Sequence, residues 1–183
     1  MGDPREDIRA VVLVGGASSR FGRDKLLEPM GDGVLVDRPI GVLREVFGSA
    51  GVVGACDGRV AERADFVVDD PYPGKGPIGG VLAALEHAGG AVFVLPGDMP
   101  AIDAASVRAI LEEAGRHPEA VAVIGRTDRP EPCIGVYRRS ALALLAAAIR
   151  EDRLSIGRAI GERVEVPIEL GAARNVNRVE DLE

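Results

Sequence analysis

Short runs of apolar, often β-branched residues alternate along the chain of 183 residues with stretches of helical periodicity. The runs are apolar at consecutive positions, which is typical of parallel strands that helices cover on both faces. They fall at residues 8–14, 51–55, 65–68, 91–95, 120–124, 133–137 and 163–166. This alternation predicts an α/β fold: a three-layer α/β/α sandwich with a mostly parallel, Rossmann-like sheet.

Four helices are expected between these runs. Each one opens at a proline or at a side chain suited to capping, and three of them are followed by a glycine that can end a helix. The opening residues are Asp37, Pro77, Asp103 and Ser140, and the closing glycines are Gly48, Gly89 and Gly115.

Length, composition and charge exclude several classes of protein. The length suits a single domain over residues 1–183, and 46% apolar with 28% charged residues is the balance of a globular chain. A formal net charge of −7 repels polyanions, so we expect no nucleic acid and no membrane surface as the main partner. Cys56 and Cys133 lack the spacing of a zinc site or a disulfide framework, so we expect two reduced thiols.

The first ten residues contain acidic side chains where a secretory signal would carry positive charge. No apolar stretch reaches the ~18 residues that a membrane span requires. We therefore expect a cytoplasmic protein.

Glycine and proline gather where predicted strands end, at residues 15–22, 71–80 and 96–100. Ligands of open α/β sheets bind in the crevice beyond the carboxyl ends of the strands. These three loops are therefore the first candidates for a binding site.

The loop from Leu13 to Lys25 is the strongest single signal. Gly15 and Gly16 let the backbone approach a ligand closely, and successive N–H groups can surround phosphate oxygens. Two serine hydroxyls follow, and Arg20 and Lys25 add two cations. The loop has the composition of a triphosphate cradle, although a glycine-rich turn with solvated charges is the alternative.

Three better-known glycine loops do not fit. A P-loop needs GxxxxGK followed by Ser or Thr, but Phe21 stands five residues after Gly16. A dinucleotide fingerprint needs GxGxxG, whereas the order here is GGxxxxxG. A short-chain dehydrogenase needs Tyr and Lys four apart, and Tyr72 precedes Lys75 by three.

Two further groups of oxygen-bearing side chains could serve a metal ion or a phosphate. Asp98 follows a predicted strand, and an ionised carboxylate there can bind Mg²⁺, although a solvated turn residue is the alternative. Asn175 and Asn177 point the same way if the chain is extended, so they can complete a metal sphere or bind an acceptor phosphate. They could equally cap a short helix that starts at Arg178.

Four ordered motifs resemble a known family. The LxGGxSxRxGxDK pattern resembles the signature loop of nucleotidyltransferases with the nucleotide-diphospho-sugar transferase fold, and its Asp24-Lys25 ending is most similar to the molybdenum cofactor guanylyltransferases. The segments DDPYPGKGPIGG, FVLPGDMP and NVNRVEDL agree in order, and EPCIGVYRRS is similar to that family's strand before its late helix.

The resemblance implies an activity and a set of site residues. The activity is transfer of GMP from GTP to the phosphate of molybdopterin, with pyrophosphate released and Mg²⁺ as cofactor. The implied catalytic residues are Arg20, Lys25 and Asp98. The implied metal ligands are Asp98 and Asn177, and the implied acceptor contacts are Asn175 and Asn177. The implied nucleotide contacts are Leu13, Gly15, Gly16, Lys25, Asp70, Gly76, Pro77 and Asp98, with Asp69 as an alternative to Asp70.

Other activities stay open at this point. Relatives that use CTP, or that activate sugar phosphates or small phosphorylated acids, share the glycine loop and the metal aspartate. Gly54 or Cys56 stands where relatives often carry Asn near the ribose. A catalytically silent nucleotide-binding protein is a further alternative, which product formation with Mg²⁺ would exclude.

Overall fold

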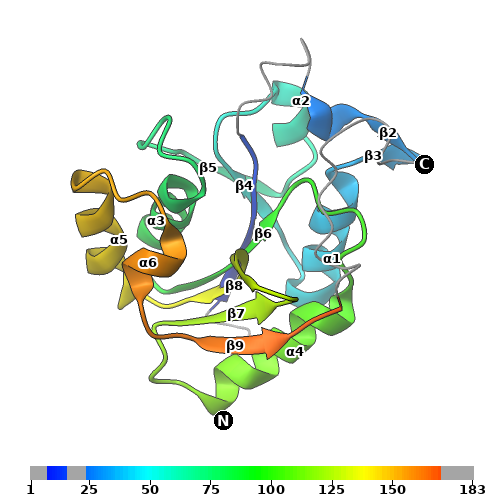
Figure 1. Ribbon diagram of the computed structural model, residues 1–183. Helices are drawn as coiled ribbons and strands as arrows, with labels where there is room; N and C mark the ends of the chain where they lie inside the picture. The colour runs from blue at the N-terminus through cyan, green and yellow to red at the C-terminus, as the bar shows by residue number, and fades with distance from the viewer. Residues whose placement is uncertain (1–7, 16–23, 170–183) are drawn as a thin grey trace.

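A computed structural model describes residues 8–15 and 24–169, and Figure 1 shows how its elements are arranged. Seven strands of the described chain form one sheet. These strands are β1 (Ile8–Leu13), β4 (Gly51–Val53), β5 (Phe66–Val68), β6 (Ala91–Pro96), β7 (Ala122–Arg126), β8 (Pro130–Tyr137) and β9 (Val164–Pro167). The helices are α1 (Asp37–Phe47), α2 (Gly58–Ala61), α3 (Pro77–Ala88), α4 (Ala104–Arg116), α5 (Ala141–Arg150) and α6 (Ile156–Ile160).

The strands lie in the order β5-β4-β1-β6-β8-β7-β9. β8 runs antiparallel to both of its neighbours, β6 and β7. The other neighbouring pairs of this sheet are parallel. The predicted mostly parallel sheet is confirmed, with β8 as its antiparallel member.

The helices cover the sheet on both faces. α1 and α4 contribute to one buried apolar cluster, while α3, α5 and α6 contribute to a second cluster on the opposite face. The three-layer α/β/α arrangement predicted from the sequence is therefore confirmed. No helix in the described ranges is both long enough and apolar enough to span a bilayer.

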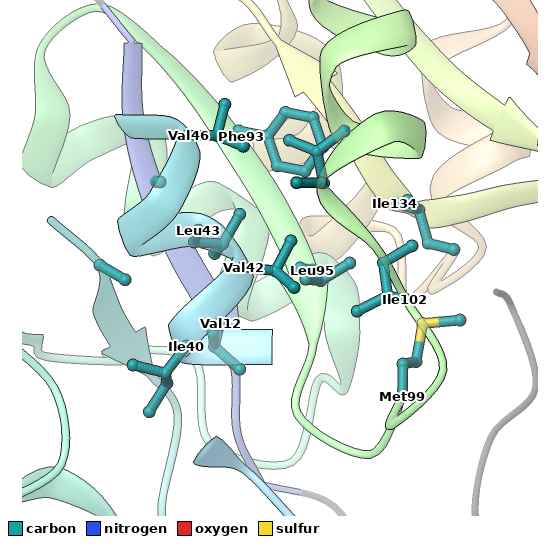
Figure 2. Close-up of a cluster of buried hydrophobic side chains, with 14 of the residues drawn as sticks. Val12, Ile40, Val42, Leu43, Val46, Phe93, Leu95, Met99, Ile102 and Ile134 are labelled. Atoms are coloured by element: carbon teal, nitrogen blue, oxygen red, sulfur yellow. The ribbon is translucent and has the colours of Figure 1, made fainter. Parts of the chain in front are cut away.

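The central strands are buried on both sides. In β6, Phe93 and Leu95 belong to the cluster under α1 and α4, whereas Val92 and Val94 belong to the other cluster. All four side chains are fully buried. Figure 2 shows the first cluster, in which Leu43 of α1 joins the side chains of the sheet. This two-sided burial is the reason that the strand is apolar at consecutive positions.

Several helix boundaries agree with the predicted signals. Pro77 is the first residue of α3, and Gly48 and Gly89 follow α1 and α3 in left-handed conformation, with φ of 81° and 67°. The carboxylate of Asp103 accepts a hydrogen bond from the Ser106 amide at 2.8 Å, which caps α4. Ordinary capping chemistry therefore sets these boundaries.

Two predicted boundaries are wrong. Asp37 is the first residue of α1 rather than its cap, and its carboxylate instead accepts a hydrogen bond from the amide of Val34, the last residue of β3, at 2.8 Å. Gly115 does not end α4, because the helix continues to Arg116 and His117 follows it. The α4 stripe packs on the sheet through its earlier turns, so one glycine in the last turn is tolerated.

Four short elements have no counterpart among the predictions. They are too short to show a periodicity, and two of them, α2 and α6, span a single turn. The other two are the 3-10 helix η2 (Lys25–Leu27) and a hairpin of β2 (Pro29–Met30) and β3 (Gly33–Val34).

Candidate active site

Three parallel strands end side by side at one edge of the sheet. β1 lies between β4 and β6, and Leu13 at its end is level with Val53 on one side and Pro96 on the other. From β1 the chain continues to β4 and β5, which extend the sheet on one side of β1. The next strand in sequence, β6, lies on the other side of β1. Such a change of direction between adjacent strands is where open α/β sheets form a ligand crevice.

The backbones that continue from β1 and β4 lie side by side at close range. The Val14 amide donates to the Val53 carbonyl at 2.9 Å. A Cβ on Gly54, whose φ is +115°, would lie 1.7 Å from the Val14 carbonyl oxygen. A Cβ on Gly15, whose φ is +108°, would lie 2.9 Å from the Ala55 carbonyl oxygen. A glycine is therefore required at position 15 because the backbone there lies against the backbone of Ala55. The sequence alone indicated only a close approach to a ligand.

Lys25 and Asp98 meet at this edge. The Lys25 ammonium donates to Oδ2 of Asp98 at 2.6 Å, although the two residues are 73 positions apart. The side chains are 26% and 19% exposed, so both are partly withdrawn from water and still reachable by a ligand. The structure thus brings together the predicted phosphate-binding cation and the predicted metal-binding carboxylate.

The residue before Lys25 fixes its position. One carboxylate oxygen of Asp24 accepts from the Leu26 amide at 3.0 Å, which caps η2, and the other accepts from the Asp57 amide at 3.2 Å. Leu26 is buried in the cluster beneath α1. Asp24 therefore joins the end of the glycine-rich loop to the loop after β4, and Lys25 is held where it faces Asp98.

The carboxylate of Asp98 fits a hard divalent cation. Over residues 8–15 and 24–169, no group of three or more His, Cys, Asp or Glu side chains is placed to hold a metal ion. Mg²⁺ usually takes only one or two oxygen ligands from protein and the rest from phosphate and water. A single carboxylate after a strand therefore suits Mg²⁺, whereas a structural zinc ion would need four side chains.

The loop after β5 leads directly into α3. Gly76 has a positive φ of 69° and precedes Pro77, the first residue of the helix, as predicted. Asp70 accepts a hydrogen bond from the Tyr72 amide at 2.8 Å, so its carboxylate stabilises the turn at the start of this loop. The N-terminus of α3 presents its amides and its positive dipole end at this place, which favours anionic or carbonyl groups.

Tyr72 fixes this loop on α3. A Cβ on Gly79 would lie 3.0 Å from Cβ of Tyr72, and the Tyr72 hydroxyl donates to Oε1 of Glu86 at 2.8 Å. Burial first, and then the Glu86 carboxylate, raise the pKa of Tyr72 to about 12, so the phenol stays neutral. The sequence analysis did not include Tyr72 in the site. The signal was present, because Tyr72 is an aromatic residue in a Gly/Pro-rich loop of a chain with only 3% aromatic residues.

Leu13 connects the two halves of the site. A Cβ on Gly80, in the first turn of α3, would lie 3.1 Å from Cδ2 of Leu13. The last side chain of β1 therefore packs on the start of α3, close to Pro77. The end of β1, from which the glycine-rich loop continues, and the start of α3 therefore lie next to each other.

The sequence profile of the MobA-like NTP transferase domain matches residues 10–166. The chain belongs to this family. It is therefore a nucleotidyltransferase, as the resemblance of its motifs implied.

Two curated relatives carry the name "Probable molybdenum cofactor guanylyltransferase". The protein from Opitutus terrae is 36% identical over 162 residues, which are 86% of this chain and 79% of that protein. The protein from Aquifex aeolicus is 31% identical over 177 residues, which are 93% of this chain and 86% of that protein.

Solved structures share the fold. Molybdopterin-guanine dinucleotide biosynthesis protein A from Archaeoglobus fulgidus superposes with a TM-score of 0.71 at 27% identity, over 96% of this chain and 95% of that one. 2-C-methyl-D-erythritol 4-phosphate cytidylyltransferase from Thermus thermophilus gives a TM-score of 0.64 at 16% identity, over 96% and 95% of the two chains. The second match shows that the architecture also serves other chemistry.

The surroundings of both thiols favour the neutral form. Burial, followed by the charges of Glu131 and Asp98, raises the pKa of Cys133 to about 11. Burial, followed by the charges of Asp24 and Asp57, also raises the pKa of Cys56. Both cysteines are free and partly buried, as expected, and the influence of Asp98 shows that Cys133 lies near the candidate site.

Four of the site residues that the resemblance implies lie outside the described residues: Gly16, Arg20, Asn175 and Asn177. Their roles stay predictions.

Proposed function

We propose that this chain transfers GMP from GTP to the phosphate of molybdopterin and releases pyrophosphate. One observation carries the proposal: relatives named as molybdenum cofactor guanylyltransferases align with most of the chain at 30% identity or more. The contact between Lys25 and Asp98 at the carboxyl edge of the sheet supports the proposal that the reaction takes place there.

The reaction needs orientation and charge neutralisation more than it needs a base. An acceptor phosphate oxygen, already a nucleophile near neutral pH, forms a bond to the α-phosphorus of GTP while the bond to pyrophosphate breaks. In such transfers positioning and electrostatic stabilisation are the main protein contributions. Lys25, with Arg20 as the second cation, would donate to the oxygens of the leaving β- and γ-phosphates.

Asp98 would hold Mg²⁺, with Asn177 as a second oxygen ligand. When bound, the ion supplies positive charge beside the α-phosphate. Asp98 has a second task in the free protein, because its Oδ2 accepts a hydrogen bond from the Lys25 ammonium and so holds that side chain in place. Asn175 would contact the acceptor phosphate.

Guanine would be read at the start of α3. The backbone groups around Gly76 and Pro77 can meet the N1/N2 donor edge and the O6 acceptor of the base, beneath the side chain of Leu13. A site built for these hydrogen bonds leaves polar groups unpaired when another base binds. Asp70, or Asp69, would contact the nucleotide from the same loop.

Residues 1–183 would act as one nucleotidyltransferase domain, because both apolar clusters lie on the same sheet. We place the reaction in the cytoplasm. Two free cysteines are typical of a reducing compartment and support this location.

The experiment uses purified protein, molybdopterin, Mg²⁺ and GTP labelled at either the α- or the γ-phosphorus. The proposal requires the α-label in the product with molybdopterin and the γ-label in pyrophosphate. CTP is assayed in parallel and should give a kcat/KM lower by about tenfold or more, the effect of roughly one unpaired buried polar group. Equal turnover of CTP would overturn the assignment of guanine, and α-label that stays in unreacted GTP would overturn the proposed activity.

A further inference from the structure

An ion pair joins the loop before α3 to the end of α5. Nζ of Lys75 donates to Oδ1 of Asp152 at 2.9 Å, across 77 positions of sequence. Lys75 stands between Gly74 and Gly76, which have positive φ of 79° and 69°. Two glycines so placed let the chain turn sharply on either side of the lysine.

The backbone of Asp152 is unusual. Among the described residues, Asp152 is the single non-glycine residue with positive φ, at 54°. Its amide and that of Arg153 donate to the carbonyls of Ile149 and Ala148, at 3.1 and 2.8 Å, which closes the C-terminus of α5. Glycine is the usual residue at such a left-handed helix end, because it has no Cβ. The helix cap therefore gives no reason for an aspartate, whereas the contact with Lys75 does.

The other end of the pair rests on α3. A Cβ on Gly79 would lie 3.3 Å from Cβ of Lys75, so the lysine stem packs against the first turn of the helix. The Lys75 amide donates to the Tyr72 carbonyl at 3.1 Å. Tyr72 is in turn bound to Glu86 further along α3. The loop is thus attached to α3 on one side and, through Lys75, to the end of α5 on the other.

We propose that Lys75 and Asp152 form a latch that holds the 69–76 loop in place over the N-terminus of α3, which makes both of them positioning residues for GTP. The inference rests on the proposed function, in which this loop contacts the nucleotide. The lysine and aspartate side chains are 36% and 77% exposed, so the pair contributes little to the stability of the whole fold. Its effect lies in preorganisation, because a loop that is already ordered loses less entropy when the ligand binds.

The test is a double-mutant cycle with Asp152→Gly, Lys75→Met and the combined variant. Steady-state kinetics give kcat and the KM for GTP, thermal unfolding gives Tm, and hydrogen exchange in the absence of nucleotide gives the protection of the amides at 72–79. Glu151→Gln is the matched control, since Glu151 is the neighbouring exposed carboxylate and its ion pair, with Arg153, is local.

The latch predicts that each single variant raises the KM for GTP by about two- to fivefold, the range of exposed ion pairs, with kcat within about twofold of the parent. The combined variant should be no worse than either single one. Asp152→Gly should keep or raise Tm, because glycine suits the left-handed position, and yet exchange faster at 72–79. If Asp152 had only a structural role, its replacement would not raise the KM for GTP while Tm stays the same or rises.

Other results overturn the inference. If Lys75→Met raises KM while Asp152→Gly does not, Lys75 binds the nucleotide directly and the pair is no latch. Unchanged KM and unchanged exchange in Asp152→Gly also contradict it. Hydrogen exchange separates this failure from failure of the proposed function, because faster exchange in Asp152→Gly supports the latch even if the parent protein does not turn over GTP.

Discussion

Lys25 and Asp98 carry opposite charges at the ends of two different loops, and each is about a quarter exposed or less. Charges in such a setting attract more strongly than charges on an open surface, because less water screens them. The bond between them keeps a flexible lysine side chain at the place where phosphate oxygens are proposed to bind. The lysine is therefore oriented before the nucleotide arrives.

Replacement of this lysine should weaken nucleotide binding without loss of the fold. Charge-assisted hydrogen bonds contribute about 1.5 to 3 kcal/mol, so Lys25→Ala should raise the Kd for GTP roughly ten- to hundredfold in calorimetry. Lys25→Arg keeps the charge and should lose less. A Kd for GTP that does not change in the folded Ala variant would exclude this role.

Sequence reasoning at this scale identified Lys25 and Asp98 separately but not their contact. Lys25 stood out as a cation that ends a glycine loop, and Asp98 as a carboxylate that follows an apolar strand. Their 2.6 Å bond depends on β1 and β6 being neighbours, which no local pattern indicates. Asp70 shows the converse, because its turn-forming role could be predicted from its place before Pro71, whereas a contact with the nucleotide stays a prediction.

At the scale of elements, the ends of β1 and β4 fit together only because Gly54 has no side chain. Gly54→Ala would place a Cβ 1.7 Å from the Val14 carbonyl oxygen and would force an unfavourable φ. Strain of this kind costs about 1 to 3 kcal/mol, so urea unfolding should show a loss of this order and GTP affinity should fall with it. Gly58→Ala is the control, because a Cβ there meets no atom within 4 Å. Equal stability of both variants would contradict this close contact between the backbones at Gly54 and Val14.

The cap of α4 gives a test that depends on pH. Asp103→Ala removes the bond to the Ser106 amide and should destabilise the protein by about 1 kcal/mol at pH 7. That amide lowers the pKa of Asp103 below its ordinary value of 3.8, so its contribution is present above the unfolded pKa and is lost as pH falls through the folded pKa. The difference from the parent should therefore shrink below about pH 3.8. A difference in unfolding free energy between parent and Asp103→Ala that stays constant down to pH 2 would show that the carboxylate charge is irrelevant. Asp103→Asn can still cap the helix and should therefore lose less stability than Asp103→Ala.

The elements that were predicted correctly are those with a repeated physical signal. Strands such as β6 are apolar on both faces because helices cover both faces, and α3 is bounded by Pro77 and Gly89, whose backbones suit the two ends of a helix. The hairpin of β2 and β3 gave no signal, because each strand has two residues. Asp37 was misassigned because a capping residue and the first residue of a helix look alike in sequence, and only the contact with Val34 separates them.

At the scale of the whole molecule, the order of the strands builds the candidate site. The glycine-rich loop follows β1, Asp98 follows β6, and the first turn of α3 lies beside Leu13 at the end of β1. Segments that are distant in the sequence thus meet at one edge, and buried apolar clusters pack on both faces of the sheet behind them. Figure 1 shows the helices on these two faces, and Figure 2 shows the cluster under α1. A rigid frame keeps the reacting groups of two substrates in register, which is the main protein contribution to phosphoryl-type transfer.

The most direct test of the account is the rate of pyrophosphate release by Asp98→Asn across a Mg²⁺ titration, with GTP and molybdopterin as substrates. Asn keeps the size of the side chain and one carbonyl oxygen but removes the charge. The account predicts a loss of turnover of about 10²-fold or more, on the order of one preorganised electrostatic contact, while the Kd for GTP changes much less. Glu45→Gln, at an exposed ion pair between α1 and α4, is the control and should keep the parent rate. If Asp98→Asn turns over at the parent rate at low Mg²⁺, Asp98 is only a turn residue and the proposed site is wrong.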